Sequence, residues 1–172
     1  MPPTLRSRVP LFALALAAIA SCAPATALSS TRAGAQARPV TSENTPNLPP
    51  VTKAERAVRY ALDEVGVPYR WGGESPGTGF DCSGLVRWAY GQVGIDLPHS
   101  SYALYGEGRR VSGSNLAPGD ILFFEGLGHV GLYLGRGRMV HAPQTGRDVE
   151  VVRLSSTNYG ARLIGARRVV AA

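Results

Sequence analysis

The sequence Gly79-Phe80-Asp81-Cys82-Ser83-Gly84-Leu85-Val86 passes from a glycine-rich loop into an amphipathic run. This change places Cys82 at or next to the first turn of a helix. There, unpaired backbone N–H groups and the helix dipole stabilise an anion. We therefore expect Cys82 to form its thiolate more readily than a free cysteine does. A thiolate is a nucleophile, and a nucleophile needs a base.

Downstream histidines are the candidate bases. His129 opens one apolar, strand-like segment and His141 lies within another, with its apolar neighbours on the opposite face of the strand. If residues 129–134 and 138–142 form a hairpin around Gly135-Arg136-Gly137, both histidines lie at the same end of a sheet. One can then act as base while the other fixes its tautomer and orientation. A cysteine followed by distant histidines is the order of a cysteine hydrolase.

Each of these residues also has a plainer interpretation. A lone cysteine is more often a small buried hydrophobe, and a histidine at a sheet end is often only hydrogen-bonded. The polar neighbours on both sides of Cys82 favour catalysis over a core role. His99, after Pro98 at a helix start, is expected to be a surface or capping residue. No His/Cys/Asp cluster has ligand spacing, so we expect neither a metal nor a cofactor.

The helices of the predicted domain, residues 51–172, come first in the chain. Thr52 and Glu55 form a capping box that begins a helix with an apolar face through Leu62 and Val65, ended by Gly66. A second helix is predicted from about Cys82 to about residue 93. A short third helix is predicted from residue 100 or 101 to residue 105.

Short apolar segments separated by turns follow these helices. They predict antiparallel strands at residues 121–124, 129–134, 139–142, 149–154 and 163–170. N-terminal helices packed on an antiparallel sheet of about five to six strands make an α+β fold. Papain-like hydrolases have this geometry, with the nucleophile on a helix and the histidines on strands.

The first 22 residues have the pattern of an export signal, with two arginines, an apolar stretch over residues 9–20 and small residues after it. The apolar stretch is too short to be a transmembrane helix. Ile19-Ala20-Ser21-Cys22 resembles a bacterial lipobox, which predicts that Cys22 is lipidated and anchors the protein to a membrane. In a Gram-negative host, Ala23 would imply the outer membrane. Ala25-Thr26-Ala27 is an alternative site for ordinary signal cleavage, which would release a soluble product.

Residues 23–50 have the composition of a disordered linker. The formal net charge of +6 is shared evenly between residues 1–50 and the predicted domain, with dispersed arginines. Without a basic helix or an aromatic–basic strand, nucleic-acid binding has no support. Because Cys22 is either lipidated or removed, Cys82 has no disulfide partner in an exported protein.

Six segments of the domain resemble, in order and spacing, the successive signatures of the NlpC/P60 family of bacterial cell-wall cysteine peptidases. The resemblance covers essentially all of residues 51–172, and six signatures in register make it specific. The segments are Pro68-Tyr69-Arg70-Trp71-Gly72-Gly73, Phe80–Val86, Leu97-Pro98-His99-Ser100-Ser101, Leu116-Ala117-Pro118-Gly119-Asp120, Gly128–Tyr133 and Val140-His141-Ala142.

The resemblance implies a papain-like endopeptidase that cleaves peptidoglycan stem peptides, of the small lipoprotein type of murein endopeptidase. By matching position, Cys82 is the nucleophile, His129 the general base and His141 the third, orienting residue. The hydroxyl of Tyr69 would help to hold the oxyanion beside the backbone N–H of Cys82. Asp81 and Ser83 would line the pocket for the residues before the scissile bond. For Trp71 we expect a core position.

The resemblance leaves the bond open, since family members cut either D-alanyl–diaminopimelate cross-links or the γ-D-glutamyl bond within one stem. No wall-binding domain pattern precedes the catalytic one, so we expect an open groove with less demand for a free stem N-terminus. We also expect the protein to be a monomer. The alternative is a peptidoglycan-binding envelope lipoprotein of the same fold without turnover. An acyltransferase of the circularly permuted branch is disfavoured because the cysteine here precedes the histidines.

Overall fold

The computed structural model describes residues 50–170 of the 172-residue chain. The predicted export signal with Cys22, and nearly all of the predicted linker, lie outside these residues. Within residues 50–170, no helix combines the length and the apolar character needed to cross a membrane. The α-helices of the described part are α1 (Lys53–Asp63), α2 (Cys82–Gly91), α3 (Ser101–Leu104) and α4 (Tyr159–Arg162).

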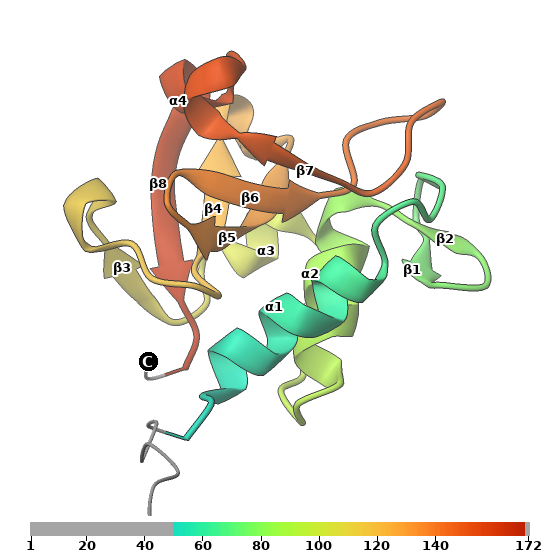
Figure 1. Ribbon diagram of the computed structural model, residues 1–172, viewed down its shortest axis with the longest axis horizontal. Coiled ribbons are helices and arrows are strands. Elements are labelled where there is room, and N and C mark those ends of the chain that lie inside the picture. The colour runs from blue at the N-terminus through green and yellow to red at the C-terminus, as the bar shows by residue number, and fades with distance from the viewer. Residues whose placement is uncertain (1–49, 171–172) are drawn as a thin grey trace, which may run out of the picture. The chain divides into compact units, whose positions relative to one another are not determined.

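An antiparallel six-stranded sheet follows the helices α1 to α3, in the order β3-β8-β4-β5-β6-β7 (Figure 1). Its strands are β3 (Arg109–Val111), β4 (Ile121–Phe124), β5 (Val130–Gly135), β6 (Arg138–His141), β7 (Glu150–Arg153) and β8 (Leu163–Arg168). A separate two-stranded hairpin joins β1 (Glu74–Ser75) to β2 (Gly79–Phe80). Three 3-10 turns lie at Gly113–Asn115, Glu125–Leu127 and Leu154–Ser156. The α+β class and the strand number are confirmed, whereas β1, β2 and β3 were not predicted, because two or three residues carry no periodicity.

The start of α1 is as predicted, and its end is not. The Thr52 hydroxyl accepts from the Glu55 N–H at 3.1 Å, and the Glu55 carboxylate accepts from the Thr52 N–H at 2.8 Å. Such a cap contributes on the order of 1 kcal/mol to helix stability. The helix ends at Asp63, before Gly66, so Val65 is beyond it and 49% exposed, and Leu62 in the last turn is 37% exposed. The predicted apolar face is therefore shorter, and residues 54, 57, 58 and 61 form its buried part.

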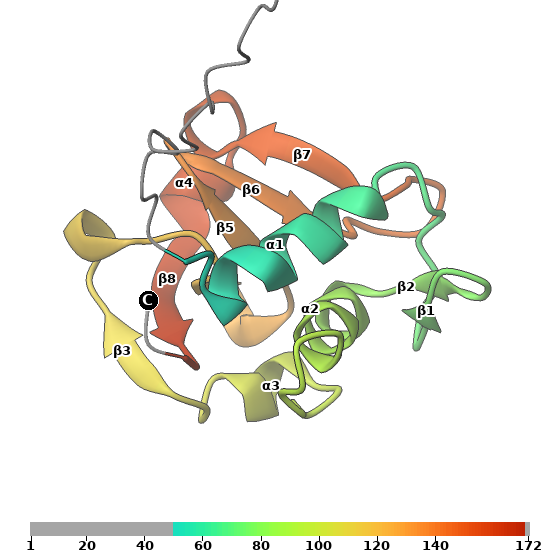
Figure 2. The ribbon, with the colours of Figure 1, turned by 60° about the horizontal axis from the view of Figure 1, so that its bottom comes forward.

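Two apolar cores lie on the two faces of the sheet. On β4, Ile121 and Phe123 join the core beneath α1 and α2, while Leu122 and Phe124 join a smaller core on the opposite face. Figure 2 shows α1 beside α2, and both helices contact β5. All four β4 side chains are fully buried. This strand, buried on both faces, holds the sheet between its two layers.

The predicted hairpin of the two histidines is confirmed. Strands β5 and β6 pair antiparallel, and Gly135 lies opposite Arg138. The two loop residues, Arg136 and Gly137, have φ angles of 52° and 67°. Positive φ at both positions is what a type I′ turn requires. Along β6, Val140 faces the core beneath the helices and Met139 the opposite core, so alternation turns His141 away from the helices.

Candidate active site

Cys82 is the first residue of α2, as predicted. Asp81 is the N-cap, and its Oδ1 accepts from the Gly84 N–H at 2.7 Å. Gly84 has a steric reason to be glycine, because a Cβ there would lie 2.0 Å from the carbonyl oxygen of Gly73. The same carbonyl accepts from the Asp81 N–H at 2.9 Å. The helix start is thus pressed against the preceding loop, which fixes the position of the thiol.

The expected stabilisation of the Cys82 thiolate is wrong. Burial raises the pKa of the Cys82 thiol, and the negative charge of Asp81 raises it further. Backbone N–H groups of Val130, Ser83 and Cys82 itself act in the opposite direction without prevailing. The helix start does supply favourable N–H groups, but the thiol is largely shielded from water and its N-cap is an anion. In the resting protein the sulfur is therefore protonated at neutral pH.

His129 and His141 form a hydrogen-bonded pair, as the hairpin predicted. Nε2 of His129 lies 2.8 Å from Nδ1 of His141, and the two rings meet edge to face. His141 is fully buried, whereas His129 is partly buried and lines a cleft with Cys82. Because Nε2 of His129 is engaged with His141, Nδ1 is the nitrogen of His129 that remains to take up a proton.

Both histidines are neutral at neutral pH. Burial, with the neighbouring His141 and Arg162, lowers the pKa of His129 to about 3. Burial, with Arg147, lowers the pKa of His141 to about 4. A thiol that shares a cleft with a neutral imidazole is suited to general-base activation of the sulfur at the moment of attack.

Tyr159 packs against both histidines, and no sequence pattern indicated this contact. Its ring stacks on His129 at a centroid distance of 5.4 Å and meets the edge of His141 at 5.0 Å. It also packs on Phe124 in the core opposite the helices. Tyr159 begins α4, a four-residue helix after a polar run, and no local pattern marks such a residue.

The cleft has a volume of about 540 Å³ and brings together five of the predicted site residues. His141 is not among its lining residues and lies behind His129. Further lining residues, which no sequence pattern marked as site residues, are Ser100, Ser101, Tyr102, Gly128 and Pro143. The predicted residues lining it are Tyr69, Asp81, Cys82, Ser83 and His129.

The expectation that Trp71 belongs to the core is wrong, since its side chain is 85% exposed and lines the cleft. The Gly73 N–H donates to the Arg70 carbonyl at 2.9 Å, and Gly72 has a φ of 69°. These features make Trp71 the first central residue of a β-turn, a position that points outward. The Gly72-Gly73 pair was the signal in the sequence that could have revealed it.

Asp81 does more than cap the helix. Its Oδ1 also accepts from the Ser83 hydroxyl at 3.1 Å and contacts His99 Nε2 at 2.9 Å, while Oδ2 accepts from the Gly72 N–H at 3.0 Å. With the bond to Gly84, Oδ1 has three partners and Oδ2 has one. Asp81 therefore builds and orders the cleft wall, with Oδ1 held by the helix start and His99 and Oδ2 held by the loop at Gly72.

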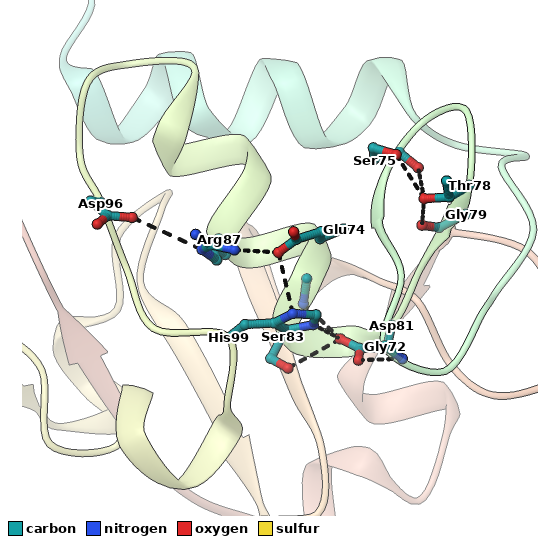
Figure 3. A network of polar contacts seen from close by, with 11 residues as sticks. Gly72, Glu74, Ser75, Thr78, Gly79, Asp81, Ser83, Arg87, Asp96 and His99 are labelled. Carbon is teal, nitrogen blue, oxygen red and sulfur yellow. Dashed lines mark hydrogen bonds and ion pairs between the residues drawn. The ribbon is translucent and has the colours of Figure 1, made fainter.

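The assignment of His99 to the surface or to a cap is wrong. Its side chain is 23% exposed, and Ser100 is the N-cap of α3. Figure 3 shows His99 between the carboxylates of Asp81 and Glu74, with Arg87 on the far side of Glu74. His99 lies 18 residues from Asp81 in the chain. This contact depends on the tertiary fold and has no local sequence signal.

The part of the chain that the structure describes contains no candidate metal site. Among residues 50–170, no group of three or more His, Cys, Asp or Glu side chains is placed to hold a metal ion.

A family model described as the NlpC/P60 family matches residues 66–168, a span that contains the cleft and both histidines. The chain belongs to the NlpC/P60 family. A solved NlpC/P60 family protein from Bacillus cereus superposes with a TM-score of 0.67 at 34% identity, covering 71% of this chain and 42% of the other. The papain-like α+β fold expected from the sequence is thereby confirmed.

Two curated relatives carry activity names. A probable endopeptidase of Mycobacterium tuberculosis is 53% identical over 108 residues, which are 61% of this chain and 28% of the relative. The murein DD-endopeptidase MepH of Escherichia coli is 38% identical over 130 residues, which are 69% of this chain and 48% of the relative. The chain thus spans less than a third of the first relative's length and about half of the second's.

Proposed function

We propose that this NlpC/P60 protein is a cysteine endopeptidase that cleaves amide bonds in peptidoglycan stem peptides or their cross-links. The observation that carries the proposal is the cleft in which the thiol of Cys82, at a helix start, lies with a histidine whose far nitrogen is bound to a second, buried histidine. The names of the two relatives, an endopeptidase and a murein endopeptidase, support both the reaction and the substrate.

The neutral pair sets the order of proton transfers. As the sulfur of Cys82 attacks the amide carbonyl carbon, its proton passes to Nδ1 of His129, and the carbonyl oxygen becomes an oxyanion. The backbone N–H of Cys82 and the hydroxyl of Tyr69 are the proposed donors to that oxygen. His129 then returns the proton to the leaving nitrogen as the C–N bond breaks. A water molecule, deprotonated by His129, hydrolyses the acyl-enzyme and frees the thiol.

Digestion of purified sacculi by the full-length protein tests this function. Separation of the products by mass identifies the bond, because cleavage of cross-links and cleavage after D-glutamate give different fragments. We expect soluble peptides with one new amine and one new carboxyl group per cut. Products ending only at D-glutamate would exclude cross-link cleavage, and intact sacculi would contradict the function itself.

We expect the rate of hydrolysis to stay nearly constant as the pH falls into the mildly acidic range. The active state needs a neutral His129, and a lowered pKa keeps the imidazole neutral to lower pH. With the pKa at about 3, kcat/KM on a soluble cross-linked peptide should change less than about twofold between pH 7 and pH 5. An imidazole with its ordinary pKa would lose about 25-fold. A pH–rate profile measures this, with circular dichroism at each pH as the control for folding. An acid limb with its midpoint near 6.5 would mean that the His129 pKa is ordinary and would contradict the prediction.

The membrane anchor is a separate part of the proposal and rests on Ile19-Ala20-Ser21-Cys22. We expect Cys22→Ala to abolish lipid attachment and to leave the protein in the soluble fraction of the envelope. Fractionation of cells expressing the full chain measures this, with Cys82→Ala as a matched cysteine control that should stay with the membrane. Membrane association of the Cys22→Ala protein equal to that of the parent would refute the anchor.

A further inference from the structure

His141 carries a buried nitrogen with an unusual environment. Its Nδ1 contacts His129, but its Nε2 has no partner with hydrogen-bond geometry within residues 50–170. The charged atom that approaches this nitrogen is Oε1 of Glu150, at 3.4 Å. A polar atom fully buried without a partner is costly, so the placement of a carboxylate beside it calls for an explanation.

The protonation pattern of the two histidines explains why a carboxylate lies beside this nitrogen; the explanation rests on the proposed function. For Nδ1 of His129 to take the proton of Cys82, neutral His129 must carry its own hydrogen on Nε2. That N–H then donates to Nδ1 of His141, which must be unprotonated. Neutral His141 therefore carries its hydrogen on Nε2, the nitrogen that faces Glu150. An N–H at this position needs an acceptor, and a carboxylate oxygen is one.

Glu150 is held in place from both sides. It is the first residue of β7, and the register of the β6–β7 pair sets it directly opposite His141. One terminal nitrogen of Arg147 donates to both oxygens of Glu150, at 2.8 and 2.6 Å. The backbone carbonyl of Arg147 accepts from the Tyr69 N–H at 2.8 Å, which ties this loop to the cleft. The Glu150 carboxylate is therefore held in a fixed position beside the His141 imidazole.

We propose that Glu150 is a positioning residue that selects the Nε2–H tautomer of His141 and thereby holds His129 with Nδ1 free for the thiol. The chain of contacts runs from Arg147 to Glu150, then to His141 and to His129. No proton leaves His141 during the reaction. When His129 becomes an imidazolium, the carboxylate stabilises the positive charge through the intervening ring.

Nuclear magnetic resonance of the full-length protein with 15N-labelled histidine tests the tautomer without any turnover. The chain has three histidines, so the ring signals can be assigned with His99→Gln and His141→Gln variants. We expect His141 to show a protonated Nε2 and an unprotonated Nδ1. Glu150→Gln, which keeps an acceptor oxygen, should preserve this tautomer. Glu150→Met, of similar length with only a weak sulfur acceptor, should lose it.

Kinetics on a cross-linked stem peptide give the second measurement. Glu150→Met should lower kcat about 10- to 100-fold with little change in KM, by analogy with the loss of the outer partner of a metal-bound histidine. Glu150→Gln should retain more of kcat than Glu150→Met, and Glu107→Met, on an exposed glutamate far along the chain, should match the parent protein. An unchanged tautomer in Glu150→Met, or its loss in Glu150→Gln, would overturn the proposal. An inactive parent protein would overturn the proposed function instead, while the tautomer measurement still decides the role of Glu150.

Discussion

Cys82→Ala is expected to lower the rate of peptidoglycan hydrolysis by more than ~10³-fold. The methyl group cannot form the acyl-enzyme, and the hydroxyl groups in the cleft are weaker nucleophiles than a sulfur that gives its proton to His129. The loss should fall on kcat rather than on KM, because the cleft walls are unchanged. Release of soluble fragments from sacculi, followed over time at equal protein concentration, measures the effect.

The fold of Cys82→Ala should remain intact, since removal of one sulfur atom from a partly exposed position leaves little cavity. Thermal unfolding of both proteins is the control for this. Binding of the variant to intact sacculi separates the two function classes. A parent protein that binds sacculi as the variant does, yet releases nothing, would support the non-catalytic envelope protein. Full activity in Cys82→Ala would refute the role of the thiol.

Local patterns were sufficient for the parts of the site that local geometry builds. Asp81 capping a helix that begins at Cys82 depends on residues within one turn. The meeting of His129 and His141 follows from strand alternation and a two-residue turn, both of which can be deduced from a few adjacent positions. For the same reason the α+β order of helices and strands was predictable.

Contacts between distant segments were not predictable from these patterns. Tyr159 contacts the histidine pair although it follows both histidines by many residues in the sequence. His99 contacts Asp81, which lies 18 residues earlier in the chain. The pKa of Cys82 was predicted in the wrong direction because burial is a property of the assembled fold. One part of that error was visible in advance, since the anionic N-cap directly before the thiol opposes the helix dipole. Glu150 lies opposite His141 through the β6–β7 register, which needs the pairing of two strands to be known.

The segment before β4 contributes to stability through a buried ion pair between Asp120 and Arg168. Asp120 is 1% exposed, and its two oxygens accept from Arg168 at 2.6 and 2.7 Å. Oδ2 also accepts from the Ala117 N–H at 2.8 Å, and Arg168 further donates to the Asn115 carbonyl at 2.9 Å. The pair therefore ties residues 115–120 to the end of β8, on the sheet that carries both histidines.

Arg168→Met is expected to lower the free energy of unfolding by about 3–5 kcal/mol, because it leaves the Asp120 carboxylate buried without its counter-charge. Urea unfolding of the full-length protein measures the change, with an unaltered slope indicating that the same surface is exposed. Arg153→Met, on an exposed arginine of β7, is the matched control and should change stability by less than about 0.5 kcal/mol. Adding Asp120→Asn to Arg168→Met should recover part of the loss, since the buried charge is then gone. A loss below about 1 kcal/mol in Arg168→Met would mean that water or another cation reaches Asp120 and that the pair does not hold this segment.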